Sequence, residues 1–272
     1  MEFFTTVWQA LRESDPQEKG RLVERLYTNL AQDCFTFAHE GPVLEVQTPS
    51  YAQIATVVRP RDVPKRKHFD NFEGQGVLLH AIAHIEYSAI DLALDAAYRF
   101  RHLPKAFYMD WIEVAHDEVR HFEMLAGLME QVGVRYGDYA VHSALFDAGQ
   151  KTAGSLLERM AVVPRYLEAA GLDANPRIMQ KLRRYPQTPM IEAIVEALEV
   201  ILEEEVEHVR KGDRWFKYAC REAGVEEGVY FEIIERYYPG LEGKNLTLNV
   251  PARRRAGFAC DELRRMGAKE CE

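Results

Sequence analysis

The sequence lacks any apolar run long enough to cross a membrane. A transmembrane helix needs about 20 consecutive apolar residues, and no stretch approaches that length. The first residues also lack a basic segment followed by an apolar core, so the sequence predicts no secretory signal. The hydrophobic content of 47% and charged content of 28% are ordinary for a soluble protein. We therefore expect a cytoplasmic protein that makes no membrane contacts.

Cysteines are few and are not grouped. The 272 residues include four, Cys34, Cys220, Cys260 and Cys271, and none forms a Cys-x-x-Cys pair. This spacing argues against a zinc ribbon, an iron–sulfur site or a disulfide framework. A reducing compartment agrees with the expected cytoplasmic location.

Basic residues are also in the minority. Lys and Arg number 34 against 43 Asp and Glu, giving a net charge of −9, which disfavours nonspecific binding to nucleic acid. Three consecutive arginines at residues 253–255 are the main exception. Such a run is more often a solvated turn or an intramolecular clamp, so we read no strong nucleic-acid signal.

Strand signals are nearly missing. Only residues 43–46 and 246–250 look β-like, and prolines at 42 and 49 bracket the first of these segments. Helical periodicity dominates elsewhere. Four long helices are predicted at residues 73–101, 105–132, 150–170 and 189–223, the third kinked by Pro164. Short helices are expected at residues 176–184, 226–237 and 261–266.

These patterns predict an all-α protein organised as one structural domain. Residues 73–224 form a four-helix bundle of the ferritin-like kind. Residues 1–40 are an N-terminal helical segment that packs on the bundle, and residues 41–72, rich in proline, are an extended strap. Residues 225–272 hold a C-terminal helix and an irregular tail.

Two copies of a Glu-x-x-His step, at residues 118–121 and 205–208, are the most informative motif. Side chains three apart on a helix share a face, so each step directs a carboxylate and an imidazole the same way. Each step interrupts an apolar stripe, which places it inside the bundle. Two such steps and one Glu from each of two other helices form the di-metal site of carboxylate bundle proteins.

The remaining two carboxylates are assigned from the other helices. Glu86 is the only charged residue on the apolar stripe of the first helix, and Glu158 lies beside small residues on the third. The predicted metal ligands are Glu86, Glu118, His121, Glu158, Glu205 and His208. Two divalent cations neutralise four buried glutamates, and neutral imidazoles complete the coordination. Carboxylate and imidazole donors favour iron or manganese over metals that prefer thiolates.

The alternative interpretation is that each Glu-x-x-His step is only a surface hydrogen bond, which is the usual role of such a pair. Two steps in buried stripes, in register with two further glutamates, favour the metal site. Other polar residues are candidates for supporting the ligands through hydrogen bonds; they are His84, Tyr87, His116 and His142. His80 and His84, four residues apart, also have the spacing of a zinc clip, but they lie off the Glu86 stripe.

Several segments resemble a known family: residues 60–64, 80–86 with 89–96, 117–122, 159–165, and 205–209 with 214–216. They are similar to the motifs of a bacterial ferritin-like family, domain of unknown function 455, over roughly residues 41–266. The resemblance implies a ferritin-like fold and a di-metal centre at the six ligand positions. A more distant similarity, to a ferritin-like tRNA hydroxylase that modifies an isopentenylated adenosine, suggests oxygen-dependent hydroxylation by analogy alone.

The leading hypothesis is a di-metal oxidoreductase that activates dioxygen or peroxide, with iron the first choice and manganese or a mixed Fe/Mn pair the alternatives. Its substrate would be a small molecule or a modified nucleoside, and an oxygenase also needs an electron donor. A homodimer is compatible with this class. Two alternatives stay open: metal handling (ferroxidase, storage or peroxide detoxification), and a non-enzymatic helical scaffold with a structural metal or none.

Overall fold

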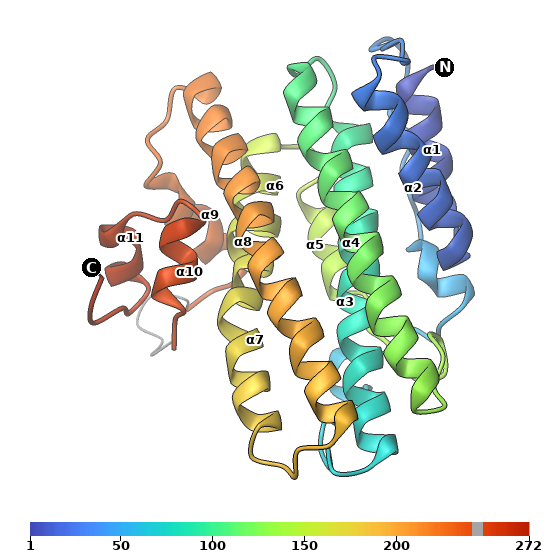
Figure 1. Ribbon diagram of the computed structural model, residues 1–272. Coiled ribbons are helices and arrows are strands. Elements are labelled where there is room, and N and C mark those ends of the chain that lie inside the picture. Colours follow the sequence, from blue (N-terminus) through green and yellow to red (C-terminus); the bar gives the residue numbers. More distant parts are fainter. Residues whose placement is uncertain (241–246, 272) are drawn as a thin grey trace. The chain divides into compact units, whose positions relative to one another are not determined.

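The computed structural model describes residues 1–240 and 247–271, and within them the protein is all-α, as predicted (Figure 1). The β-type pairings in this part of the chain are two isolated bridges, Glu2 with Thr36 and Val57 with Val141. The β-like segment at residues 43–46 is irregular. In the second such segment, residue 246 lies outside the described part and Val250 begins a helix.

The helices follow the chain in this order: α1 (Phe3–Arg12), α2 (Pro16–Ala31), α3 (Phe72–Arg99), α4 (Lys105–Gln131), α5 (Ala144–Lys151), α6 (Leu156–Val162), α7 (Ala169–Leu182), α8 (Pro189–Ala223), α9 (Val229–Tyr237), α10 (Val250–Arg255) and α11 (Cys260–Arg265). Short 3-10 turns occur at Ser50–Gln53 and Pro60–Asp62, and a π-helical turn at Val163–Glu168. The predicted first, second and fourth long helices are thus confirmed as α3, α4 and α8. The strap between α2 and α3 has only the two 3-10 turns, as its prolines predict.

The chain divides into two compact units, each described here by itself. Unit 1 comprises Met1–Asp147 and Thr188–Ala197, and unit 2 comprises Ala148–Gln187 and Leu198–Glu272. The long helix α8 is continuous and belongs to both, with its first turns in unit 1 and the rest in unit 2. The helices within residues 73–224 are therefore divided between the two units.

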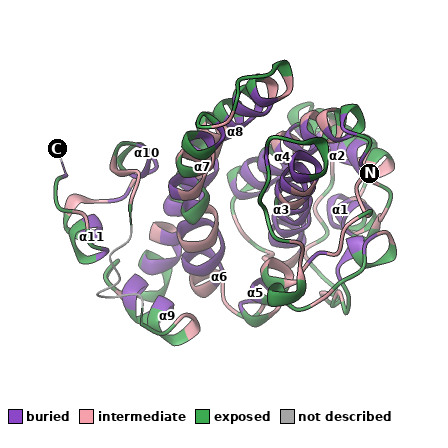
Figure 2. Ribbon diagram, turned by 90° about the horizontal axis from the view of Figure 1, so that it is seen from below, coloured by how far each residue is buried: buried purple, intermediate pink, exposed green. Residues whose placement is uncertain are grey.

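In unit 1, α3 is the central helix, and α1 and α4 pack against it, while α2 packs on α1 and α4. The residues of α3 are buried on nearly every side of the helix, as its purple ribbon shows (Figure 2). The Asn71 side chain caps its N-terminus by accepting a hydrogen bond from the Gly74 N–H at 2.9 Å. Gly74 is required there, since a Cβ would lie 2.0 Å from the His68 carbonyl oxygen.

By length and composition alone, α3 could also cross a membrane. However, 83% of its most apolar 18-residue window is buried inside the protein. A core helix of a soluble protein passes the same test of length and hydropathy. The burial of α3 therefore explains its apolar character without a membrane.

A buried lysine joins α1, α2 and α3. The Lys19 side chain is fully buried, and its Nζ donates to the carbonyl oxygens of Ala10 at 3.0 Å and Leu11 at 3.3 Å. It also forms an ion pair with Asp91 Oδ1 at 2.5 Å, while Ser50 in the strap donates to Oδ2 at 2.6 Å. Burial raises the pKa of Asp91, although the Lys19 charge opposes the shift. This network fixes the N-terminal helices and the strap on α3.

We expect Lys19→Met to destabilise the protein by about 3–5 kcal/mol, because it leaves the buried Asp91 carboxylate without its cation. Urea denaturation measures the effect. The double variant Lys19→Met/Asp91→Asn should recover a large part of the loss, since it removes both charges. Equal stabilities of the single variant and the wild type would show that this ion pair does not hold the helices together.

In unit 2, the third long helix differs from the prediction. Instead of ending near Gly171 and leaving a separate short helix, α6, the π-helical turn and α7 form one continuous helical segment from Leu156 to Leu182. Pro176 lies inside α7 rather than at the start of a new helix. The separate helix α5 precedes this segment and was not predicted.

Pro164 does disturb the third helix, as expected, because it lies within the π-helical turn and has no N–H to donate. The turn lies against α8. A Cβ at Gly212 would be 2.2 Å from the Pro164 side chain, so glycine is what lets the two backbones approach so closely. The apolar stripe of α8 therefore contains a glycine for a packing reason.

The following residue, Arg165, is fully buried in an aromatic cage. Its Nε lies 3.0 Å from Asp213 Oδ1 on α8, and its Nη2 lies 2.9 Å from Glu262 Oε1 on α11. The guanidinium carbon lies 4.6–4.7 Å from the ring centroids of Phe216, Tyr230 and Phe258. Arg165 thus connects the π-helical turn to α8, α9 and α11 by charge and by cation–π contacts.

The tail is more ordered than predicted, since α10 includes the three consecutive arginines. Arg253 is buried and forms a bidentate ion pair with Asp173 of α7, with Nη2–Oδ2 at 2.7 Å and Nε–Oδ1 at 3.1 Å. It also donates to the Ala169 carbonyl oxygen at 3.1 Å. The intramolecular clamp is therefore the correct interpretation for this arginine.

The expectation that the cysteines form no disulfide is wrong for one pair. Cys260, the first residue of α11, is joined to Cys271 near the end of the chain, while Cys34 and Cys220 are free. The pair was missed because its members are 11 positions apart and do not form a recognisable cysteine motif.

Candidate metal centre

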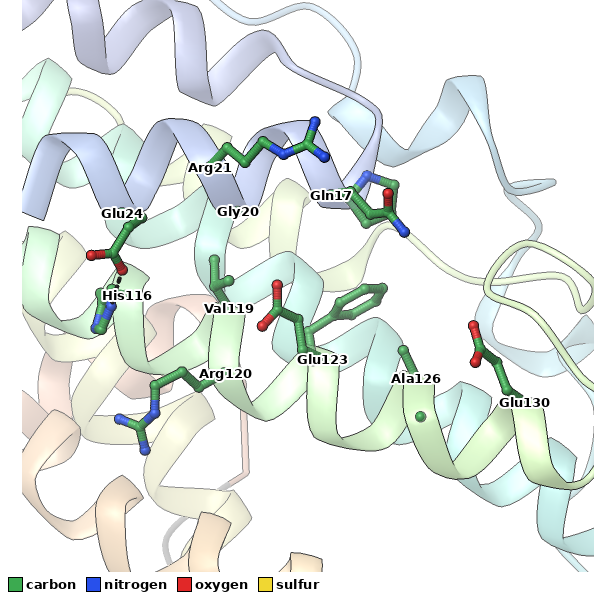
Figure 3. Close-up of a pocket in the computed structure, with 13 residues that line it drawn as sticks. Gln17, Gly20, Arg21, Glu24, His116, Val119, Arg120, Glu123, Ala126 and Glu130 are labelled. Atoms are coloured by element: carbon green, nitrogen blue, oxygen red, sulfur yellow. Dashed lines mark hydrogen bonds and ion pairs between the residues drawn. The ribbon is translucent and has the colours of Figure 1, made fainter.

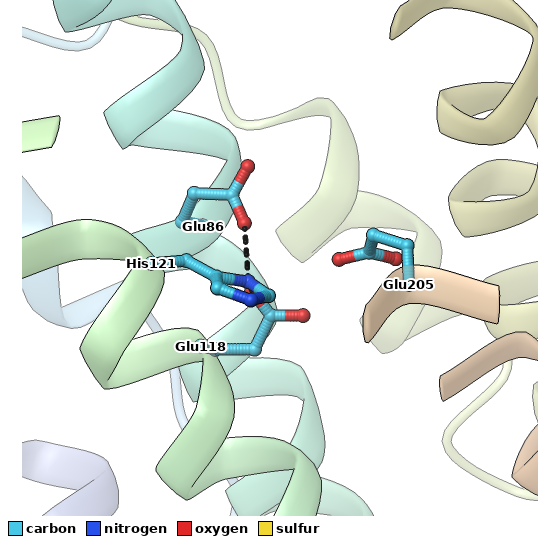
Figure 4. Close-up of side chains that lie close together, drawn as sticks. All are labelled: Glu86, Glu118, His121 and Glu205. Atoms are coloured by element: carbon cyan, nitrogen blue, oxygen red, sulfur yellow. Dashed lines mark ion pairs between the residues drawn. The ribbon is translucent and has the colours of Figure 1, made fainter. Parts of the chain in front are cut away.

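The two neighbouring helices of unit 1 bring three predicted ligands together. Glu86 comes from the middle of α3, while Glu118 and His121 come from consecutive turns of α4. His121 Nδ1 lies 3.3 Å from Glu86 Oε2 and 3.4 Å from Glu118 Oε2. Figure 4 shows these three side chains pointing toward one another. A donor atom from each lies within 4.8 Å of the others, which is close enough to hold one metal ion.

These three side chains are almost completely enclosed. Glu118 and His121 are 0% exposed and Glu86 is 5% exposed. Two carboxylates in such a place repel each other and are poorly solvated, so they need a compensating positive charge. In the absence of a metal, bound protons supply this positive charge; when a metal is bound, the cation supplies it.

The pKa values show how the metal-free cluster is balanced. Burial and the charge of Glu118 raise the pKa of Glu86 to about 8, even though His121 opposes the shift. Burial lowers the pKa of His121, but its hydrogen bonds to Glu118 and Glu86 and their charges outweigh this and raise it to about 11. The cluster therefore retains protons at neutral pH. A divalent cation that replaces them finds oxygen and nitrogen donors already gathered, so the residues fit a metal.

In unit 2, α8 carries the second Glu-x-x-His step. His208 Nδ1 lies 3.5 Å from Glu205 Oε1, and the side chains are 0% and 13% exposed respectively. Glu205, drawn with α8 in Figure 4, therefore retains access to a ligand while His208 is enclosed. As predicted, the carboxylate and the imidazole share one face of the helix.

Glu158 has other partners. It lies in the first turn of α6, where it is half-buried, and it forms an ion pair with Arg236 of α9. Its Oε2 accepts a hydrogen bond of 2.6 Å from Tyr237. Its backbone N–H donates a hydrogen bond of 3.2 Å to the Ser155 side-chain oxygen, which caps α6. To bind a metal, Glu158 would have to exchange the α9 partners, so its role as a ligand stays a prediction.

The predicted supporting residues make their hydrogen bonds elsewhere in unit 1. His84 Nδ1 accepts from the Tyr136 hydroxyl at 2.9 Å, and its Nε2 donates to the His142 carbonyl oxygen at 2.7 Å. The Tyr87 hydroxyl donates to the Ser14 carbonyl oxygen at 2.8 Å. The role of these residues in orienting metal ligands stays a prediction. The sequence did not single out Tyr136, because it lies in the loop after α4, outside any periodic pattern.

His116 lies on the outer side of α4, in a hollow of about 610 Å³ between α2 and α4 (Figure 3). Its Nε2 lies 2.7 Å from Glu24 Oε2, and its ring stacks on Tyr27 with centroids 4.4 Å apart. These contacts attach α2 to α4.

The comparisons with known proteins agree with the motif resemblance. A family model described as "Protein of unknown function (DUF455)" matches residues 12–264. The chain belongs to this family. An uncharacterized protein of Haemophilus influenzae (strain ATCC 51907 / DSM 11121 / KW20 / Rd) is 37% identical over 272 residues, covering 96% of this chain and 92% of that protein. No solved structure matches the chain significantly. DUF455 membership assigns no activity, and the ferritin-like relationship stays a prediction.

The buried histidines of α3 make a pH dependence testable. Burial lowers the pKa of both His80 and His84 to about 4, whereas an unfolded histidine titrates near pH 6.5. Between these values the unfolded chain binds more protons, so stability falls as pH drops from about 6.5 toward 4. We expect His80→Gln to flatten this loss, measured as melting temperature against pH. Parallel curves for variant and wild type would contradict the assignment.

Proposed function

We propose that this DUF455 protein is a di-metal carboxylate oxidoreductase of the ferritin-like class, which uses iron, manganese or both to activate dioxygen or peroxide. The observation that supports it best is the buried group of Glu86, Glu118 and His121. Two acidic side chains and an imidazole from adjacent helices, almost completely enclosed, are costly in a structural core unless a cation binds them.

The second half of the proposed site comes from α8. We propose that Glu205 and His208 belong to the same ligand set as Glu86, Glu118 and His121, on the ground of the repeated Glu-x-x-His step in the sequence. Glu158 supplies the fourth carboxylate by releasing Arg236. This set resembles the arrangement of ferritin-like di-metal bundles, with one Glu-x-x-His step on each of two helices.

Charge and donor type support two hard divalent cations. Four glutamates carry −4, two such ions carry +4, and neutral imidazoles add none, so the filled site is neutral. Oxygen and nitrogen donors without thiolates suit iron or manganese. When bound, such a pair supplies redox chemistry with dioxygen or peroxide.

The contribution of the protein chain is enclosure and positioning. α3 and α4 exclude water from the donors of unit 1. A small molecule or a modified nucleoside remains the proposed substrate class, and an electron donor is needed for oxygenase turnover. We propose a cytoplasmic protein, with a homodimer as its assembly.

Elemental analysis tests the metal site. Protein purified without chelator from cells supplied with iron and manganese should contain about two such ions per chain. Glu205→Gln should reduce this content, whereas Glu207→Gln, an exposed neighbour on α8, should not. A folded wild-type protein that binds no iron or manganese, even after anaerobic addition of Fe(II), would exclude the proposal.

Oxygen consumption tests the oxidoreductase part separately. With excess reductant, the iron-loaded protein should consume dioxygen over many turnovers when a substrate is present. Oxidation of only the bound Fe(II), followed by deposition of further iron, would instead place the protein in metal handling.

A further inference from the structure

A second polar pocket lies in unit 1, away from the Glu86 side of α3. It has a volume of about 110 Å³ and lies between the end of the strap, the first half of α3 and the loop after α4. Its polar lining consists of Arg66, His80, His84, Tyr139 and His142. This set contains no carboxylate, which is unusual in a chain of net charge −9.

The hydrogen bonds determine which histidine nitrogens carry a proton. His80 Nε2 accepts from the backbone N–H of Gly137 at 2.9 Å, so its proton is on Nδ1. His142 Nδ1 accepts a longer hydrogen bond from the Ala144 N–H at 3.4 Å, which leaves the proton on Nε2. Both nitrogens of His84 are already used within the protein. His80 and His142 thus each keep one N–H donor that the backbone contacts do not use.

The strap segment that contributes Arg66 to the pocket is rich in basic residues. Residues 59–67 contain Arg59, Arg61, Lys65, Arg66 and Lys67 but only one acid, Asp62. Asp62 pairs with the first two arginines, at 2.7 Å and 3.9 Å. The other three side chains are exposed and form no ion pair within the described residues.

Two acids that do not line the pocket act on its histidines, Asp138 on His80 and Asp147 on His142. Asp138 is close enough to oppose the burial that lowers the pKa of His80. The Asp138 carboxylate accepts a hydrogen bond of 2.7 Å from the backbone N–H of Arg135, and Asp138 does not line the pocket. Burial lowers the pKa of His142, and the nearby charge of Arg66 acts in the same direction.

We propose that this pocket binds a small oxyanion, a phosphate or carboxylate group, with Arg66 supplying the charge and His80 and His142 donating hydrogen bonds. Tyr139 offers a further hydroxyl. The volume is well below the roughly 300–1,000 Å³ of pockets that enclose drug-sized ligands, so it suits a single anionic group. The proposal does not depend on the metal centre.

Isothermal titration calorimetry on the metal-free full-length protein tests it, with inorganic phosphate and acetate as probes in separate arms and sodium chloride as the anion control. We expect saturable binding of one oxyanion per chain. Arg66→Gln should weaken it at least about tenfold, because a charge-assisted hydrogen bond is lost. Tighter binding of phosphate or of acetate identifies which group the pocket prefers.

The matched control is Lys67→Gln, which removes the same charge one residue away at a side chain that does not line the pocket. It should weaken binding by less than about threefold, the part due to general attraction. His142→Gln, at a half-buried position, should weaken binding without changing the melting temperature of the ligand-free protein. Equal losses in Arg66→Gln and Lys67→Gln, or no saturable binding by the wild type, would overturn the proposal.

Discussion

Glu118→Gln is expected to abolish metal binding while leaving the metal-free protein as stable as the wild type or more stable. Glu118 is 0% exposed and shares His121 with Glu86. Glutamine retains the size of the side chain but removes the charge, so a divalent cation loses a principal donor. In the metal-free protein the same change removes the repulsion that helps raise the pKa of Glu86.

The variant is informative because metal binding should be lost while the stability of the metal-free protein should not fall. Melting temperatures with and without added Mn(II) should differ for the wild type, because a ligand that binds only the native state stabilises it. They should coincide for Glu118→Gln. The control is Glu123→Gln, five residues further along α4 on its exposed face, which should retain the wild-type response. A Glu118→Gln protein that still binds two metals per chain would refute the ligand assignment.

Arg165→Met is expected to cause the largest loss of stability in unit 2, about 3–5 kcal/mol. The substitution leaves Asp213 and Glu262 buried with less compensating charge, although Lys217 Nζ still lies 2.8 Å from Asp213 Oδ2. Burial already raises the pKa of Asp213 despite Arg165. The contacts with three aromatic rings are lost as well.

Chemical denaturation followed by circular dichroism measures this effect. Arg183→Met is the control, because Arg183 forms an exposed ion pair with Glu199, and such pairs contribute about 0–1 kcal/mol. Arg165→Lys should recover only part of the stability, since an ammonium group cannot pair with both acids and stack on the rings. Similar losses for Arg165→Met and Arg183→Met would mean that the buried network adds no stability.

Long helices were predictable where the sequence marks both of their ends. α4 begins after Pro104 and ends before Gly133, and α8 begins at Pro189 and ends before Gly224. The third helix was mispredicted because glycine and proline, which mark the ends of α4 and α8, do not interrupt this helix. Gly171 and Pro176 lie inside α7, where packing of the segment outweighs the local preference to stop.

The residues of the candidate metal centre also differ in how far the sequence predicts their positions. The helical period alone predicts that Glu118 shares a face with His121, and Glu205 with His208, because side chains three residues apart on a helix share a face. The meeting of Glu86 with His121 required two helices to pack in a particular register. Glu158 shows the limit, since nothing in its local sequence reveals the competing Arg236 and Tyr237 of α9.

The sequence by itself determined the all-α class, the extents of α3, α4 and α8, and the carboxylate and imidazole composition of the candidate metal centre, because these depend on local periodicity. Only the tertiary structure decided the partners of isolated side chains. The partners in the pairs Lys19–Asp91, Arg165–Asp213 and Arg253–Asp173 are 48–80 positions apart along the chain, and the oxyanion pocket likewise joins separate segments. Such contacts form only when folded helices bring these groups together, and no local pattern encodes them.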